Sequence, residues 1–240
     1  MKSKSIFLIL ALIAVFLSSC DHDRIRAKGE IVNVDYSLSD YSVLKVSNAF
    51  NVYVRFSESE ESIRIKANEN LHDKIIVKKE DNTLVIRIKK FTSIRGNATL
   101  DAYITTKSIS DFDIAGASHI YLEDEWITQN GSIELTGASE FSGAITLNSL
   151  NLDMTGASSA DIYGSVDYLN ADLTGSSDLR DYDFSVNRLN IELTGASDAN
   201  LSINESIDIK ATGASTLSYK GAAVIDRQEL TGSSEIKNKN

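Results

Sequence analysis

Residues 136–140 read Thr-Gly-Ala-Ser-Glu, and close copies of this pentapeptide recur through the second half of the 240-residue chain. The copies are AGASH at 115–119, TGASE at 136–140, TGASS at 155–159, TGSSD at 174–178, TGASD at 194–198, TGAST at 212–216 and TGSSE at 231–235. Their glycines are separated by 21, 19, 19, 20, 18 and 19 residues. So short a period does not accommodate a pair of helices, and it fits one coil of a β-solenoid whose strands stack in parallel.

Apolar and polar residues alternate on both sides of each pentapeptide. In the third copy, apolar Leu152 and Met154 enclose polar Asp153 ahead of the turn, and apolar Ala160 follows it. Alternation with a period of two is typical of a strand with one buried face. Each repeat therefore predicts a strand, a tight glycine turn and a second strand. The expected fold class is all-β, a single-stranded parallel β-helix or β-solenoid with about seven 19-residue coils.

The turn residues agree with this prediction. Glycine adopts positive φ without a Cβ penalty, and the flanking Thr and Ser side chains can hydrogen-bond backbone groups at the corner. The chain contains no proline, which suits stacked strands because proline removes a hydrogen-bond donor from the ladder.

The part of the chain ahead of the repeats has no fixed glycine period and is predicted as less regular β structure. Short strands are expected at Val43–Val46, Asn51–Phe56, Ile63–Ala67, Ile75–Val77, Leu84–Ile88 and Leu100–Ile104. Asp81-Asn82 marks a hairpin-like turn, and Glu69–Asp73 a short helical turn. We expect one domain over residues 30–240, with an irregular part at 30–110 that covers the first edge of the repeat coils at 111–240.

The N-terminal segment is typical of a secretory signal. Lys2 and Lys4 precede an apolar run over residues 6–17, which is too short to span a bilayer as a helix. The ending Leu17-Ser18-Ser19-Cys20 resembles a bacterial lipobox, which implies that Cys20 is lipidated and becomes the new N-terminus. The expected organisation is a signal peptide at 1–20 and a polar tether at 21–29. The lipid would hold the chain in the cell envelope, at the outer membrane on its periplasmic or surface side.

Composition excludes several functions. The 34 Asp and Glu residues outnumber the 24 Lys and Arg residues, and the formal net charge is −10. A nucleic-acid binder is therefore not expected, because it needs a basic footprint. A single cysteine allows neither an intrachain disulfide nor a cysteine zinc site.

One set of acidic residues recurs at the same position on five consecutive coils. The members are Asp113, Glu134, Asp153, Asp172 and Glu192. The register predicts that they point outward about 4.8 Å apart, where two like charges repel by roughly 1 kcal/mol in water. A cation that bridges neighbouring coils would relieve this repulsion, so the column predicts a weak Ca²⁺ site. The alternative is a solvated face that keeps the protein soluble, and no other cofactor is expected.

One carboxylate pair follows the turns, Asp178 and Asp198 on neighbouring coils. Such a pair hydrolyses glycosides when one carboxyl is buried enough to stay protonated, whereas this stretch is polar and rich in small residues. Arg180 is expected to pair with Asp181 rather than to act as a base. His119 has no acid placed to complete a serine triad. We therefore expect no enzyme, with a polysaccharide lyase or glycoside hydrolase as the alternative.

Three motifs, taken with the repeats, resemble a known family. They are Phe50-Asn51-Val52-Tyr53-Val54, Asn70-Leu71 ahead of a strand, and Asn82-Thr83-Leu84-Val85-Ile86. In this order they are similar to the head GIN domain family of auto-transporter adhesins, over roughly Tyr41 to Ala223. The resemblance implies a β-helix shaped like pectate-lyase folds, without their catalytic residues, and an adhesive role in the bacterial envelope. The TGAS and TGSS turns depart from the GSG turns that are frequent in that family.

The expected function is binding or scaffolding at the cell envelope. The expected partners are the membrane, through the lipid anchor, and a glycan or a protein on the envelope or host surface. The ends of a solenoid offer unpaired strand edges, which also favours a homo-oligomer and leaves a self-assembling structural protein as a third interpretation.

Overall fold

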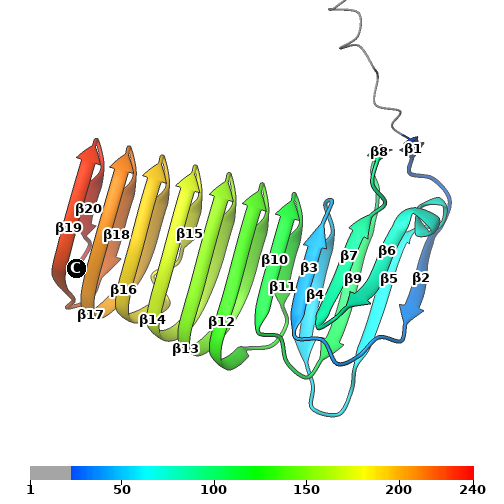
Figure 1. Cartoon of the computed structure of the whole chain (residues 1–240), viewed down its shortest axis with the longest axis horizontal. Helices are drawn as coiled ribbons and strands as arrows, with labels where there is room; N and C mark the ends of the chain where they lie inside the picture. The colour runs from blue at the N-terminus through cyan, green and yellow to red at the C-terminus, as the bar shows by residue number, and fades with distance from the viewer. Residues whose placement is uncertain (1–22) are drawn as a thin grey trace, which may run out of the picture.

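Parallel strands stacked coil on coil dominate the structure, a computed structural model that describes residues 23–240 (Figure 1). The repeat strands are β10 (Asp111–Gly116), β11 (His119–Leu122), β12 (Trp126–Gly137), β13 (Glu140–Gly156), β14 (Ser159–Gly175), β15 (Asp178–Arg180), β16 (Phe184–Gly195), β17 (Asp198–Gly213), β18 (Thr216–Lys220), β19 (Val224–Gly232) and β20 (Glu235–Asn238). In β13, β14 and β17, the strand after one corner continues without a break into the strand before the next corner.

The register joins equivalent residues of successive repeats. The corner glycines are Cα partners from coil to coil, beginning with Gly116 and Gly137 and ending with Gly213 and Gly232. All of these pairings are parallel. The predicted all-β solenoid of about seven repeat coils is thereby confirmed.

The corners require glycine for two reasons, which Gly175 illustrates. Its φ is +97°, and a Cβ atom there would lie 2.5 Å from the carbonyl oxygen of Gly156 in the preceding coil. The same oxygen accepts a hydrogen bond from the backbone N–H of Ser176 at 2.7 Å. The buried hydroxyl of Ser177 donates to the carbonyl oxygen of Thr174 at 3.0 Å, which satisfies a backbone group at the corner as predicted.

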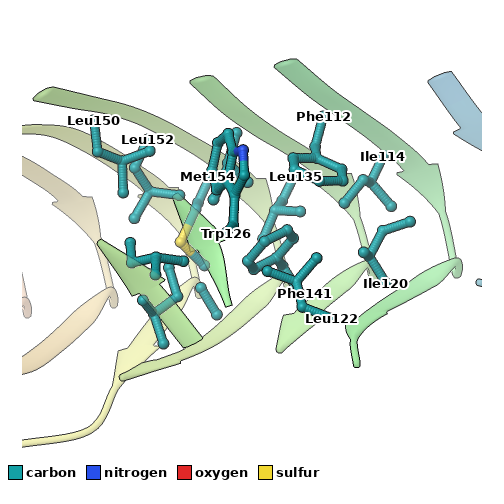
Figure 2. Packing of buried hydrophobic residues seen from close by; sticks show 14 of the residues in the cluster. Phe112, Ile114, Ile120, Leu122, Trp126, Leu135, Phe141, Leu150, Leu152 and Met154 are labelled. Atoms are coloured by element: carbon teal, nitrogen blue, oxygen red, sulfur yellow. The ribbon is translucent and has the colours of Figure 1, made fainter. Parts of the chain in front are cut away.

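Inward side chains fill the coils with a continuous apolar core. Figure 2 shows its aromatic part, where Trp126 lies among Phe112, Phe141 and neighbouring leucines. Trp126 packs edge-on against Phe112, with ring centroids 5.0 Å apart. Its Nε1 donates to the carbonyl oxygen of Ile109 at 2.7 Å, so the one buried tryptophan has its polar atom satisfied.

Antiparallel strands close the first edge of the solenoid. β9 (Leu100–Thr106) pairs with β5 (Ser62–Asn68), and β5 pairs with β2 (Ile31–Tyr36). We call these strands at the first edge the cap. Within it, β7 (Thr83–Ile88) also pairs with β6 (Ile75–Glu80), across the turn at Asp81, where φ is +52°. The first edge of the repeat coils themselves is covered by residues 43–56, whose strands pair in parallel with β10 and β11.

The stacking order in this part differs from the chain order. β3 (Val43–Ser47) lies between β7 and β10, and β4 (Asn51–Phe56) lies between β9 and β11. The coil that β3 and β4 form is therefore inserted between two coils that follow it in the sequence (Figure 1).

The N-terminal stretches also differ from the sequence prediction in part. Residues 23–26, within the expected tether, instead form β1 (Asp23–Arg26), which pairs in parallel with β8 (Thr92–Arg95). β2 and β8 lie where no strand was expected, while the six expected strands are present and Glu69–Lys74 form a 3₁₀ helix, η1. The predicted signal peptide and Cys20 lie outside the described residues. Within residues 23–240 no helix is long and apolar enough to cross a membrane.

Candidate functional site

The acidic column adopts the predicted register on the strands ahead of the corners. Successive members are Cα partners, in the order Asp113, Glu134, Asp153, Asp172, Glu192. A lysine stands at each end of the column. Lys45 of β3 pairs with Asp113, and Lys210 Nζ of β17 lies 2.5 Å from Glu192 Oε1. The column is therefore a run of carboxylates, one on each coil, closed by two ion pairs.

In the middle of the column, the surroundings of Asp153 disfavour the charged form of its carboxyl group. Partial burial raises the pKa of Asp153, and the neighbouring charge of Asp172 raises it further. A shallow hollow of about 270 Å³ lies here, and Asn170 and Asn190 contribute amide groups to it. Over the part of the chain that the structure describes, no three His, Cys, Asp or Glu side chains come together in a way that could hold a metal ion. A calcium site on this column stays a prediction.

The candidate catalytic pair is also adjacent, since Asp178 and Asp198 are Cα partners. Arg180 Nε lies 2.6 Å from Asp178 Oδ2, so the expected pairing of Arg180 with Asp181 is wrong. Asp181 instead accepts a hydrogen bond from the backbone N–H of Asp183 at 2.8 Å. The reason is the strand itself, because Asp178 and Arg180 are two residues apart in β15 and point to the same side.

A row of tyrosines crosses the outer surface of the strands that follow the corners. Tyr103 of β9, Tyr53 of β4 and Tyr121 of β11 are Cα partners in turn. The ring centroids of Tyr103 and Tyr53 are 5.0 Å apart with planes at 13°, and those of Tyr53 and Tyr121 are 5.3 Å apart at 19°. Both distances are close to the spacing of neighbouring strands, so the rings stack like the coils beneath them.

A polar groove lies beside Tyr103 at the cap end of this surface. It has a volume of about 400 Å³ and is lined by side chains of β2, β5 and β9. Asp35 is the Cα partner of Arg64, and Arg64 that of Tyr103, so the three follow one line across the strands. Arg64 Nε donates to Asp35 Oδ1 at 2.7 Å, and Lys66 Nζ lies 3.5 Å from Asp101 Oδ2. We call this hollow the Tyr103 groove.

Neither the tyrosine row nor the Tyr103 groove was expected from the sequence. The outward positions of Tyr53 and Tyr103 in their strands are visible as alternation. Their contact is not, because it depends on the insertion of the β3–β4 coil between coils that come later in the chain.

The chain matches a known protein family over most of its length. The family model described as "Putative auto-transporter adhesin, head GIN domain" matches residues 40–223. The chain belongs to this family. The head GIN resemblance expected from the three motifs is thereby confirmed. The matched range contains the tyrosine row and the acidic column, while Asp35 on β2 lies just outside it. The adhesin description indicates a cell-envelope or surface protein.

Solved structures share the fold of this head GIN protein. A "putative adhesin" from Bacteroides fragilis is 21% identical with a TM-score of 0.82, covering 89% of this chain and 99% of the other. A "putative adhesin" from Parabacteroides distasonis is 15% identical with a TM-score of 0.72, covering 90% and 100%. A "Putative lipid binding protein" from the same species is 17% identical with a TM-score of 0.73, covering 90% and 99%. None of the curated proteins matches the chain.

Proposed function

We propose that this head GIN protein is a lipid-anchored adhesin of the bacterial cell envelope, a non-catalytic module that binds a glycan or a surface protein. The observation that carries the proposal is the distribution of its outward polar groups, which recur one per coil along extended faces. Catalysis gathers a few perturbed groups in one concave site. A solenoid face instead suits the recognition of an extended ligand. The family description supports the adhesive role.

Adherence of living cells tests this function. Cells that express the full chain should adhere to mucin-coated or glycan-coated surfaces more strongly than cells without it. The Cys20→Ala variant should lose this gain, because it would no longer be held at the envelope. Equal adherence of expressing and non-expressing cells on every surface would contradict the adhesive role.

The lipid anchor is a separate part of the proposal and has its own test. A multiply acylated cysteine would hold the chain firmly, since each buried methylene contributes about 0.8 kcal/mol. Cys20→Ala should abolish labelling by a fatty-acid probe and either release the protein from the membrane fraction or leave its signal uncleaved. The neighbouring Ser18→Ala variant should still be labelled. Unchanged labelling of Cys20→Ala rules out this residue as the anchor.

A carbohydrate-active enzyme is the alternative, and it rests on the adjacency of Asp178 and Asp198. The full chain can be incubated with acidic and neutral polysaccharides while new reducing ends and unsaturated uronates are followed. We expect neither product. Turnover that disappears in Asp178→Asn or Asp198→Asn would replace the adhesin proposal with an enzyme.

Self-association is a further candidate, because within residues 23–240 the strands of the last coil are paired on one side only. β19 and β20 pair with β17 and β18 on one side, and Val224 on β19 is 64% exposed. Unpaired strand edges favour edge-to-edge contacts. Sedimentation of the full chain in detergent should then give the mass of an oligomer, and a monomeric mass at high concentration excludes this contact.

The lipid-binding name of one structural neighbour supplies an outcome for the same tests. Binding of phospholipid vesicles by the Cys20→Ala variant, with no adherence of cells that carry the native chain, would favour a lipid-binding role over adhesion.

A further inference from the structure

We propose that the Tyr103 groove binds a neutral saccharide unit of a surface glycan. This inference rests on the proposed adhesive function and gives it a ligand class and a site. Three features of the groove carry the inference: an aromatic wall held in place, paired donors and acceptors, and a cancelled charge.

The wall is the ring of Tyr103, an end member of the tyrosine row. One face of the ring stacks on Tyr53 at 5.0 Å, and the groove lies on the side of its other strand partner, Arg64. A pyranose has a face of C–H groups that packs on a flat apolar ring, while its hydroxyls project sideways to polar partners. Tyrosine offers such a flat surface with few rotatable bonds. The stack restrains Tyr103 before any ligand arrives, so binding orders little further.

The polar lining matches the hydrogen-bonding pattern of sugar hydroxyls. Each hydroxyl donates one hydrogen bond and accepts others, so neighbouring hydroxyls are best met by a donor next to an acceptor. The groove provides this arrangement with Arg64 beside Asp35 at 2.7 Å, and Lys66 on its lining lies 3.5 Å from Asp101. Asn33, also on the lining, carries both a donor and an acceptor.

The charges at the groove cancel through two ion pairs, since Arg64 pairs with Asp35 on the lining and Lys66 pairs with Asp101 just outside it. The whole chain has a formal charge of −10 and therefore repels an acidic glycan. These ion pairs leave no local excess of positive charge to offset that repulsion. A neutral saccharide meets no such penalty. Its affinity should therefore change little with ionic strength, whereas that of a charged ligand should fall as salt screens the attraction.

The dimensions also agree with a saccharide. A volume of about 400 Å³ lies within the range of sites that hold small molecules. Of the tyrosine row, only Tyr103 lines the groove, so a saccharide unit held there leaves Tyr53 and Tyr121 outside the site.

The test is titration of the full chain, purified in detergent, with hexasaccharides of glucose, mannose and N-acetylglucosamine, and with an oligogalacturonate as the charged comparison. We expect at least one neutral hexasaccharide to bind, with an affinity that stays within about twofold as salt rises across the range in which Debye screening strengthens. Tyr103→Ala should weaken that binding at least about tenfold. No binding of any neutral hexasaccharide at millimolar concentration overturns the proposal, and so does preferential binding of the oligogalacturonate.

Tyr121→Ala is the matched control, because Tyr121 is the opposite end of the same row and also loses one stacking contact with Tyr53. It should keep the affinity within about threefold. If Tyr103→Ala fails to fold, Arg64→Met gives the same answer, since this exposed residue is expected to matter for the ligand and not for the core. Equal losses in the Tyr103 and Tyr121 variants, or full affinity in Arg64→Met, place the ligand elsewhere.

The same variants separate this inference from the proposed function. Cells that carry Tyr103→Ala or Arg64→Met and still adhere like the native strain would leave adhesion standing and remove the groove as its site. Native cells that do not adhere to any surface would remove the adhesive function itself, whatever the titrations show.

Discussion

Replacement of Gly175 by alanine tests whether the corners need glycine for space as well as for backbone conformation. The new Cβ would bring two penalties. A left-handed φ, here +97°, costs an L-residue roughly 1–2 kcal/mol. The Cβ would also lie 2.5 Å from the carbonyl oxygen of Gly156, which is backbone and itself accepts a ladder hydrogen bond. Crowding of this kind typically costs about 1–3 kcal/mol. We expect a total loss of about 2–5 kcal/mol.

Gly96→Ala is the control that isolates the first penalty. Its φ of +82° is similar, but the atom nearest to a Cβ there is Arg26 Cγ at 3.7 Å, an ordinary contact. Thermal unfolding followed by far-ultraviolet circular dichroism compares the variants, and each kcal/mol should lower Tm by about 2–4 °C in a domain of this size. Equal losses in the two variants would show that the corner tolerates a methyl group, and the argument from close coil spacing would be refuted.

Three further perturbations test the register and the acidic column. Leu173→Ala empties a fully buried position and should cost about 2–5 kcal/mol, while outward Asp172→Ala should change stability by under about 0.5 kcal/mol; similar effects would mean a wrong register. Burial and Asp172 raise the pKa of Asp153, so stability is lost as the pH rises through that raised pKa. Asp153→Asn should therefore raise Tm more near pH 8 than near pH 4, and an equal gain at both would contradict this. Calcium bound to the column should raise Tm by linkage, and an increase that survives in the Asp153→Asn, Asp172→Asn double variant would place the ion elsewhere.

The repeat half of the fold follows from sequence because its signals are local and repeated. The need for each corner glycine arises only from its own repeat and the preceding one. The period of the pentapeptide therefore determines which residues become strand partners. The same period places Asp153 opposite Asp172, as the strand register has them. The short strands ahead of the repeats and the cover over the first edge were predictable for the same reason, since strand alternation and an exposed edge are local properties.

The cap and the Tyr103 groove required information that no local pattern carries. Tyr103 and Tyr53 stack only because β4 lies between β9 and β11, and nothing in the alternation of either strand specifies that neighbour. The strand β2, which supplies Asp35, does alternate apolar and polar residues over Val32–Tyr36, so its presence was within reach of the sequence. Its antiparallel pairing with β5, which forms the groove, was not. The pairing of Arg180 with Asp178 was, by contrast, within reach of the sequence, because residues two apart in a strand point to the same side.

The insertion of the β3–β4 coil has a consequence for how the molecule is assembled during synthesis. This coil leaves the ribosome before both of its neighbours, so it carries two bare edges until residues 83–106 and then 111–122 arrive to cover them. Folding of a solenoid can begin at any coil and spread to its neighbours, and from this coil it can spread in two directions, toward the cap and toward the C-terminus. Loss of the last coils would shorten one arm only. Loss of residues 43–56 would remove the coil on which both the cap strands and the repeat coils stack.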